Sequence, residues 1–352
     1  MVDLRSDNVA GAAPKILEAV VKAAVGTARS YGADEWTRRL QGHFREVFEC
    51  DCFVQPTLTG TATNALALSL LAPSWGAVLC SGTAHIHDSE CGAGEMFTGG
   101  AKILPLGHHD GRLQPEALQD YLQGVAQAGT SVAPPKVLSL TQGTERGTVY
   151  SLDAIAELAD IARGHGVRLH MDGARFANAV AALGCAPADA TWRRGIDVLS
   201  FGATKNGALA AEAVVVFDTE LAEALRYRAR KTGQVLSKMR FVSAQLEAYL
   251  AGGLWLDLAR HANAMAARLA AAIGRIDGVA LLHPVEINEL FLRLDPSIQD
   301  GLQAAGIGFY DRGGGEIRMV PAFSTTSTEI DRVAEVMGTA AASSGAAAAF
   351  SA

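Results

Sequence analysis

A lysine and an aspartate that each follow a buried strand are the residues of this sequence best suited to chemistry. Lys205 comes after the apolar run 198–201, in a turn that Gly202 and Gly207 bracket, and Asp172 ends a second apolar strand. Open α/β sheets bind ligands at the carboxyl ends of their strands, so both side chains are expected at one sheet edge. A lysine that forms a Schiff base and an aspartate that keeps a ring nitrogen protonated indicate a pyridoxal phosphate site.

Each of these residues also has an ordinary interpretation, a solvated loop lysine and an aspartate that caps a helix. A second feature favours the cofactor. Thr59, Gly60 and Thr61 lie between a short predicted strand and a long apolar helix. Unpaired N–H groups and the positive end of the dipole make a helix start an anion site, so this segment is a candidate for the phosphate. A simple threonine N-cap is the alternative.

The loop at 81–90 places His85 and His87 beside Asp88 and Glu90. Their spacing matches no recognised metal motif, so no metal site is predicted. The better functional interpretation is an imidazole of His85 stacked on a flat cofactor ring.

The composition describes a well-buried globular chain of 352 residues, with 49% hydrophobic residues and a net charge of −7. This charge argues against nucleic acid and anionic membranes as partners. The polar N-terminal residues do not resemble a signal peptide, and no apolar run is long enough to cross a bilayer. The five cysteines show no zinc-like pairing, so we expect free thiols in a reducing cytoplasm.

Strands and helices alternate between residues 137 and 217, which predicts a mostly parallel sheet with right-handed crossovers. We expect an irregular N-terminal arm at 1–15, a large cofactor-binding domain at 16–245 and a small α+β domain at 246–352. The small domain is predicted to contain a helix at 328–342 and a frayed tail from Ala340. Its strands are expected at 278–283, 289–294, 306–310 and 316–320.

A longer motif surrounds the aspartate, His170-Met-Asp-Gly-Ala-Arg175, and Thr204-Lys205 follows it. Further motifs are Asp3 to Asp7, Tyr31-Gly32, Thr59-Gly-Thr61 with Asn64, His85 with Glu90, 147–150, Asn178 and Arg318. With these motifs the chain resembles the low-specificity L-threonine aldolases over about residues 3–337. Segments 30–37 and 237–241 are similar to a branch that includes the phenylserine aldolases. The resemblance implies the aspartate aminotransferase fold, fold type I, with a mostly parallel seven-stranded sheet in the large domain.

The resemblance also implies a role for each matching residue. The catalytic residues would be Lys205, which carries the cofactor, Asp172, which binds the pyridine nitrogen, and His85, which stacks on the ring. The other cofactor contacts would be Thr59, Gly60, Thr61, Arg175, Thr204, Tyr31 and Arg240, of which Tyr31 and Arg240 reach into the site of a neighbouring subunit. The substrate carboxylate would bind Ser6, Arg175 and Arg318.

One departure from the family concerns proton transfer. Relatives place a second active-site histidine just before the strand that here begins at Val137, and our alignment puts Ser131 there. We therefore expect His85 or an ordered water to take the proton of the β-hydroxyl. The cation that meets the phosphate stays open among Arg230, Lys231, Lys238 and Arg240.

The activity implied is retro-aldol cleavage of L-threonine, L-allo-threonine or L-phenylserine to glycine and an aldehyde, and the reverse addition. The enzyme would be a homodimer or homotetramer, with active sites at the subunit interface. Racemisation or β-elimination on the same scaffold is the alternative. No GxGxxG or Walker pattern follows a strand, which argues against a nucleotide-binding protein. A non-catalytic binding descendant would not need the Lys205–Asp172 pair.

Overall fold

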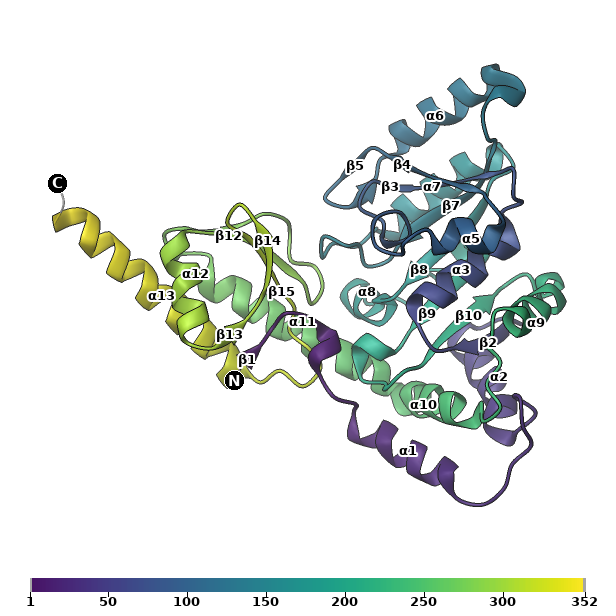
Figure 1. Ribbon diagram of the computed structural model, residues 1–352, viewed down its shortest axis with the longest axis horizontal. Helices are drawn as coiled ribbons and strands as arrows, with labels where there is room; N and C mark the ends of the chain where they lie inside the picture. The colour runs from purple at the N-terminus through teal and green to yellow at the C-terminus, as the bar shows by residue number, and fades with distance from the viewer. Residues whose placement is uncertain (1, 351–352) are drawn as a thin grey trace.

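A computed structural model describes residues 2–350, with side chains described to residue 343. Seven strands form one large sheet in the order β2-β10-β9-β8-β7-β3-β4 (Figure 1). All the pairs in this sheet are parallel except those that β10 makes with β2 and β9, so the predicted, mostly parallel seven-stranded sheet is confirmed. The strands are β2 (Phe53–Thr57), β3 (Ala77–Ser81), β4 (Lys102–Leu106), β7 (Pro135–Thr141), β8 (Arg168–Gly173), β9 (Val198–Gly202) and β10 (Glu212–Val216).

Helices bury both faces of this sheet because successive side chains of a strand point to opposite sides. Val198 of β9 packs in a cluster with Leu66 of α3, whereas Leu199 and Phe201 pack on the other face with Phe176 of α8. The helices of this part of the chain are α1 (Pro14–Ala24), α2 (Glu35–Phe48), α3 (Gly60–Leu71), α4 (His85–Asp88), α5 (Ala93–Thr98), α6 (Pro115–Ala128), α7 (Leu152–Gly164), α8 (Phe176–Leu183), α9 (Ala222–Lys231) and α10 (Arg240–Leu250). The hairpin β5 (His108–His109) and β6 (Arg112–Leu113) follows β4.

A second, four-stranded antiparallel sheet lies beside the large one, in the order β11-β12-β15-β14 (Figure 1). Helix α11 contacts α8 of the large part and α13 of the small part, and so connects the two. The elements of the small part are α11 (Leu254–Ile273), β11 (Val279–Leu281), β12 (Leu290–Leu294), α12 (Pro296–Ala304), β13 (Ile307–Gly308), β14 (Tyr310–Gly313), β15 (Glu316–Met319) and α13 (Ser327–Phe350).

The N-terminal arm is more ordered than predicted. Its strand β1 (Val2–Asp3) pairs in parallel with β13, and Val2 and Leu4 are buried in the core of the small part. The arm is therefore not irregular throughout, because two apolar side chains and a strand ladder tie its beginning to distant residues.

The C-terminal tail also differs from the prediction. Helix α13 continues through the alanine-rich segment from Ala340 to Phe350, and alanine has the highest intrinsic helix propensity. Residues 351–352 of the predicted tail lie outside the described residues. The domain boundary predicted between 245 and 246 falls inside α10, which packs on α1 and α2, and that division stays a prediction.

Between residues 2 and 350, no helix combines the length and the apolar character that a membrane span requires. The five cysteines of the chain, all within the described residues, are free thiols.

Candidate active site

Lys205 lies in a short 3-10 turn, Thr204–Asn206, that directly follows β9. The next residue, Asn206, is buried and donates a hydrogen bond from Nδ2 to the hydroxyl of Tyr249 at 2.7 Å. Gly207 ends the turn with a φ of 109°, in the region that favours glycine. Because its neighbours are fixed in this way, the lysine projects from a rigid position. Its amine has no hydrogen-bond or ion-pair partner among residues 2–343, and it borders a cavity.

A buried carboxylate, Glu212, lies beneath the same turn and accepts the N–H of Ala203 at 2.9 Å. Burial raises the pKa of Glu212 to about 7, against the hydrogen bond from Thr204. The hydroxyl of Thr204 also accepts the N–H of Ala211 at 3.2 Å, and Thr204 does not border the cavity. The position of Thr204 thus favours a role in shaping the turn over a direct cofactor contact.

Asp172 ends β8, the parallel neighbour of β9, and lies at the same sheet edge as Lys205, as the sequence predicts. Neighbouring side chains of a strand point to opposite faces of the sheet. The side chain of Met171 packs on the α8 face, so the buried side chain of Asp172 points to the α3 face. Its Oδ2 accepts a hydrogen bond from Nδ2 of Asn64 at 2.8 Å, and its Oδ1 accepts the N–H of Ala174 at 2.9 Å. These two donors fix the direction of the carboxylate.

His170 lies two residues before Asp172 and is fully buried. Its Nδ1 is 2.9 Å from the hydroxyl of Ser139, and its Nε2 is 2.9 Å from the hydroxyl of Ser200. Burial lowers the pKa of His170 to about 4, so the imidazole is neutral near pH 7. His170 supports the floor of the site through two hydroxyls and does not border the cavity.

Helix α3 begins at the cavity. Thr59 is its N-cap and accepts the N–H of Ala62 at 3.2 Å, while Gly60 and Thr61 border the cavity. A Cβ added at Gly60 would meet no atom within 4 Å, so the space beside this backbone is open. The N-cap interpretation therefore holds for Thr59, and the geometry of the next two residues suits an anion at the helix start.

The imidazole of His85 is oriented by a carboxylate. Its Nδ1 lies 2.8 Å from Oε1 of the buried Glu90, and the same oxygen accepts a hydrogen bond from Nδ2 of Asn64 at 2.8 Å. The hydrogen bond to Glu90 raises the pKa of His85, and burial opposes that shift only in part. The side-chain amide of Asn64 thus links the His85–Glu90 pair to Asp172.

These groups surround one cavity of about 220 Å³. It brings together side chains and backbone that come from the N-terminal arm, α3, α4, the ends of β7, β8 and β9, and the small part. The residues that border it are Ser6, Asn8, Gly60, Thr61, Asn64, His85, Glu90, Thr141, Gly143, Glu145, Asp172, Ala174, Arg175, Lys205, Glu289 and Arg318.

Arg175 and Arg318 both reach the cavity, but their partners differ. Nε and Nη2 of Arg175 donate to the two carboxylate oxygens of Asp7 at 2.8 and 3.1 Å, and Nη1 lies 3.2 Å from Oε2 of Glu289. Nη1 of Arg318 lies 3.7 Å from Oε1 of Glu289, and the buried Nε of Arg318 has no hydrogen-bond partner within the described part of the chain. The guanidinium of Arg175, which was predicted to bind the substrate carboxylate, is therefore already paired with Asp7 and Glu289. The guanidinium of Arg318 has fewer close partners among the described residues.

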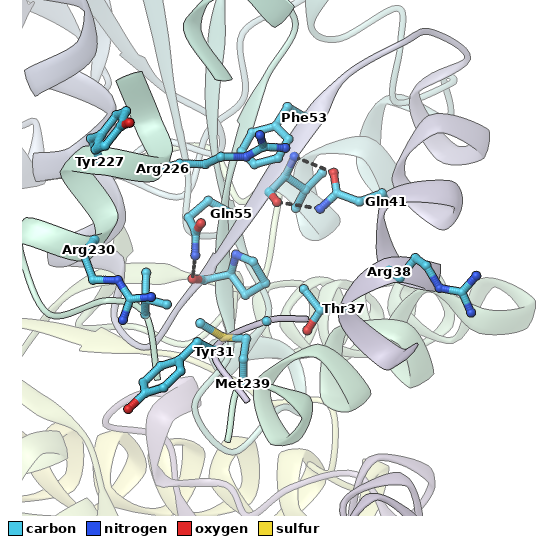
Figure 2. Close-up of a pocket in the computed structure, with 14 residues that line it drawn as sticks. Tyr31, Thr37, Arg38, Gln41, Phe53, Gln55, Arg226, Tyr227, Arg230 and Met239 are labelled. Carbon is cyan, nitrogen blue, oxygen red and sulfur yellow. Dashed lines mark hydrogen bonds between the residues drawn. The ribbon is translucent and has the colours of Figure 1, made fainter. Parts of the chain in front are cut away.

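Tyr31 and Arg240 do not border this cavity. Tyr31 lies at a separate hollow beside the edge strand β2, where the guanidinium of Arg230 sits 4.8 Å from the centroid of its ring (Figure 2). Arg240 donates to the backbone of Gly26 at 3.4 Å. Of the other predicted phosphate cations, Arg230, Lys231 and Lys238 are exposed, and none of the four borders the cavity of this chain.

Ser131 also lies away from the site. It follows α6 and precedes β7, and so belongs to the amino-terminal edge of the sheet, where it borders a hollow with Trp75 and Lys102. A side chain at Ser131, before β7, therefore cannot reach the cavity of the same chain, because the cavity lies at the carboxyl end of that strand. At the other end of β7, Thr141, Gly143 and Glu145 border the cavity, and Glu145 is the residue among them that carries a titratable side chain.

Sequence reasoning missed three acidic residues of the site, Asp7, Glu145 and Glu289. Glu145 carried a usable signal, because it follows a predicted strand by a few residues, as Asp172 and Lys205 do. Asp7 lay in a motif of the family resemblance but without an assigned role, and Glu289 carried no signal, because their partner Arg175 lies far away in the sequence. A buried arginine must be paired, but the sequence does not say with which residue.

Pyridoxal phosphate fits the residues present. Asp172 is oriented and buried to bind a protonated ring nitrogen, His85 can cover the ring, and Lys205 has a free amine on a fixed turn. The open space beside Gly60 at the start of α3 suits the phosphate. No group of three or more histidine, cysteine, aspartate or glutamate residues in the described chain has the geometry to hold a metal ion.

Comparisons with known proteins point to one family. A model of the β-eliminating lyases matches residues 3–297. The chain is 42% identical over 330 residues to a low-specificity L-threonine aldolase of Pseudomonas sp. (strain NCIMB 10558), covering 94% of this chain and 95% of that one. The enzyme of the same name from Pseudomonas aeruginosa is 42% identical over 332 residues, covering 94% of each. A solved threonine aldolase from Leishmania major superposes with a TM-score of 0.90 at 27% identity, over 97% of this chain and all of that one.

Proposed function

This chain belongs to the β-eliminating lyase family, with the low-specificity L-threonine aldolases as its relatives, and on that premise we propose its reaction and the roles of its residues. It is a pyridoxal-phosphate-dependent aldehyde-lyase that cleaves L-β-hydroxy-α-amino acids to glycine and an aldehyde, and catalyses the reverse addition. The observation that carries the proposal is the placement of Lys205 and Asp172 at neighbouring strand ends around one cavity.

The residues of the site would hold the cofactor at three points. Lys205 attaches it, Asp172 binds its ring nitrogen, and the N–H groups at Gly60 and Thr61 hold its phosphate. When bound, the cofactor withdraws the electron pair that is left on Cα when a bond to that carbon breaks. His85 covers the ring, and its bond to Glu90 fixes the plane of the imidazole.

Arg318 is the group best placed to bind the substrate carboxylate, with Ser6 beside it at the cavity. Its buried Nε lacks a partner within the described residues, so an incoming carboxylate would satisfy it. Arg175 holds Asp7 and Glu289 and so supports the wall behind. Fixing the carboxylate selects which bond at Cα can break, because that bond must stand perpendicular to the cofactor ring.

The partner is a second copy of the chain. Leu17, Val21 and Val25 form an apolar stripe on the outer side of α1 and its end, with exposed fractions of 43%, 66% and 74%. Tyr31, which is 53% exposed, follows on the same segment, beside the cations at the hollow of Figure 2. Docking of this face on another subunit would bury the stripe, and it would bring Tyr31 and a cation such as Arg230 or Arg240 to the phosphate end of the neighbouring site. The free cysteines favour a cytoplasmic location.

An aldehyde assay tests the proposed reaction. L-threonine, L-allo-threonine and L-phenylserine are incubated with the wild type and with Lys205→Ala, and both aldehyde and glycine are quantified. We expect equal amounts of the two products from the wild type and none from the variant. Lys102→Ala, at an exposed lysine outside the cavity, is the matched control and should retain full activity. Appearance of the D-amino acid without aldehyde would show racemisation and refute the proposal.

A further inference from the structure

We propose that Glu145 is the base that accepts the proton of the substrate β-hydroxyl as the Cα–Cβ bond breaks. This inference deepens the proposed function and rests on it. It assigns to a carboxylate the proton transfer that the sequence alone left to His85 or to a water.

The position of Glu145 supports this role. The residue lies beyond the carboxyl end of β7 and borders the cavity together with His85, Lys205 and Arg318. Its Oε1 accepts two hydrogen bonds, from the backbone N–H of His85 and from the hydroxyl of Thr141, both at 2.8 Å. Its Oε2 is buried and has no hydrogen-bond partner within the described chain. One oxygen therefore anchors the carboxylate while the other is left for a ligand.

Each other acid–base group of the cavity has a bonded partner or another role, although Oε2 of Glu90 and Oε2 of Glu289 are also buried without a hydrogen-bond partner in the described chain. Both oxygens of Asp172 accept hydrogen bonds, and Lys205 is the attachment point of the cofactor. Oε1 of Glu90 lies 2.8 Å from Nδ1 of His85, and this hydrogen bond raises the pKa of the imidazole. Glu289 lies against Arg175. Nδ1 of His85 is engaged by Glu90 and the ring is assigned to the cofactor, so the carboxylate of Glu145 is the group left to take the proton.

The surroundings of Glu145 tune it for proton exchange near neutral pH. Burial and the charge of Asp172 raise its pKa to about 7, against the two hydrogen bonds to Oε1. The other titratable groups that interact with Glu145 are Cys80, Arg146, Tyr150 and Arg175, whereas His85 contributes through its backbone N–H. A base whose pKa is close to the working pH is present as an anion and still holds a proton long enough to return it.

The β-hydroxyl proton moves to Oε2 of Glu145, and the O–H electron pair becomes the second bond of the aldehyde C=O. The Cα–Cβ pair remains on Cα, and the aldehyde leaves. A proton added to Cα then completes glycine, and Glu145 loses its proton to solvent before the next turnover.

Glu145→Gln keeps the shape of the side chain but cannot accept a proton. We expect kcat for L-phenylserine cleavage to fall by roughly 10²–10⁴, the usual contribution of a general base, with a much smaller change in KM. In the wild type, kcat should decline as the pH falls below about 7, because Glu145 becomes protonated. That decline should be absent from the variant. Exchange of the glycine α-proton in D₂O, followed by NMR, involves no β-hydroxyl and should persist in the variant.

Glu95→Gln is the matched control. Glu95 is another glutamate with a buried, unpartnered Oε2, but it does not border the cavity, so this variant should keep the wild-type pH profile. If Glu145→Gln does not fold, Thr141→Val provides a second variant. Loss of the hydroxyl donor destabilises the anion of Glu145, so the acid limb of kcat should move to higher pH.

A measurement without turnover completes the test. Infrared spectra of the cofactor-free protein between pH 5 and 9 should contain a carboxylic acid band that titrates near 7. Subtracting the Glu145→Gln spectra separates Glu145 from Glu212, which titrates in the same range. An unchanged acid limb in both Glu145→Gln and Thr141→Val would overturn the inference while wild-type cleavage still upholds the proposed function. Absence of aldehyde from the wild type would refute the function itself.

Discussion

The carboxylate of Asp7 holds the guanidinium of Arg175 through two hydrogen bonds, to Nε at 2.8 Å and to Nη2 at 3.1 Å. Burial alone would raise the pKa of Asp7, but the charges of Arg175 and Lys205 keep it below its ordinary value. The pair joins the N-terminal arm to the end of β8, close in sequence to Asp172. A side chain from the arm thus holds in place an arginine that borders the cavity.

Asp7→Asn should be strongly destabilising, because it leaves the positive charge of Arg175 buried with one carboxylate partner fewer. Removal of one partner from a buried ion pair costs about 3–5 kcal/mol, and Tm should fall accordingly. Asp3→Asn, which breaks the solvent-screened pair with Arg5, is the control and should lower Tm much less.

The pH dependence of this pair has a defined sign. The folded pKa of Asp7 lies below the unfolded value of 3.8, so its stabilisation is present above pH 3.8 and is lost as the pH falls through the folded value. Thermal scans of the wild type should show this loss, and Asp7→Asn should not. Equal Tm values for Asp7→Asn and Asp3→Asn would contradict the structural role of Asp7.

The two arginines of the cavity should respond differently to the same substitution. Arg318→Lys should raise KM for the amino acid roughly tenfold, as expected from the loss of one charge-assisted hydrogen bond, with little change in Tm. Arg175→Lys should lower Tm, because an ammonium cannot replace the two-point contact with Asp7. Steady-state kinetics and thermal unfolding of both variants would decide, and an unchanged KM in Arg318→Lys would exclude its role in carboxylate binding.

The sheet and its edge were predictable, because their signals are local. Apolar strands followed by Asp172 and Lys205, and the loop-to-helix junction at Thr59, each lie within a few residues of sequence, and parallel strands bring such ends together. The partners of these residues were not predictable. Asn64 meets Asp172 and Asp7 meets Arg175 only after helices and the arm have packed. Long-range pairs follow from tertiary packing, which no short spacing encodes.

The errors have the same origin. The pairing of β1 with β13 depends on a strand about 300 residues away, so the arm looked irregular. The position of the family's second active-site group was expected at Ser131, which precedes β7 and lies at the amino-terminal end of that strand. Glu145, which reaches the cavity, follows the carboxyl end of β7. Applying to Glu145 the strand-end rule that identified Asp172 would have found it.

His170 should make the fold sensitive to mild acid. Its folded pKa of about 4 lies below the ordinary value of 6.5, so the unfolded chain takes up a proton first as the pH falls. Stability should therefore decline between pH 6.5 and 4, by about 3 kcal/mol at the acid end. Tm measured across this range should fall less steeply for His170→Gln than for the wild type. His165→Gln, at an exposed histidine, should follow the wild type, and parallel slopes for all three proteins would refute the assignment.

Subunit mixing can establish whether Tyr31 acts on the neighbouring site. Lys205→Ala and Tyr31→Ala should each have little activity as pure proteins. In a mixed dimer of the two, the subunit that retains Lys205 receives an intact Tyr31 from its partner, so one native site is restored. Random exchange at equal concentrations in a two-fold symmetric dimer should then restore about a quarter of the wild-type sites.

A matched control uses the other exposed tyrosine at the hollow of Figure 2. Tyr227→Ala should be active by itself, because Tyr227 lies on the outer side of α9 with an exposed fraction of 72%. Activity is measured with L-phenylserine after the mixed subunits have exchanged, and the exchange is verified by mass spectrometry of the intact dimers. If Tyr31 served its own chain, the mixed dimer would contain no native site. Absence of recovery despite complete exchange would therefore place Tyr31 outside the neighbouring site.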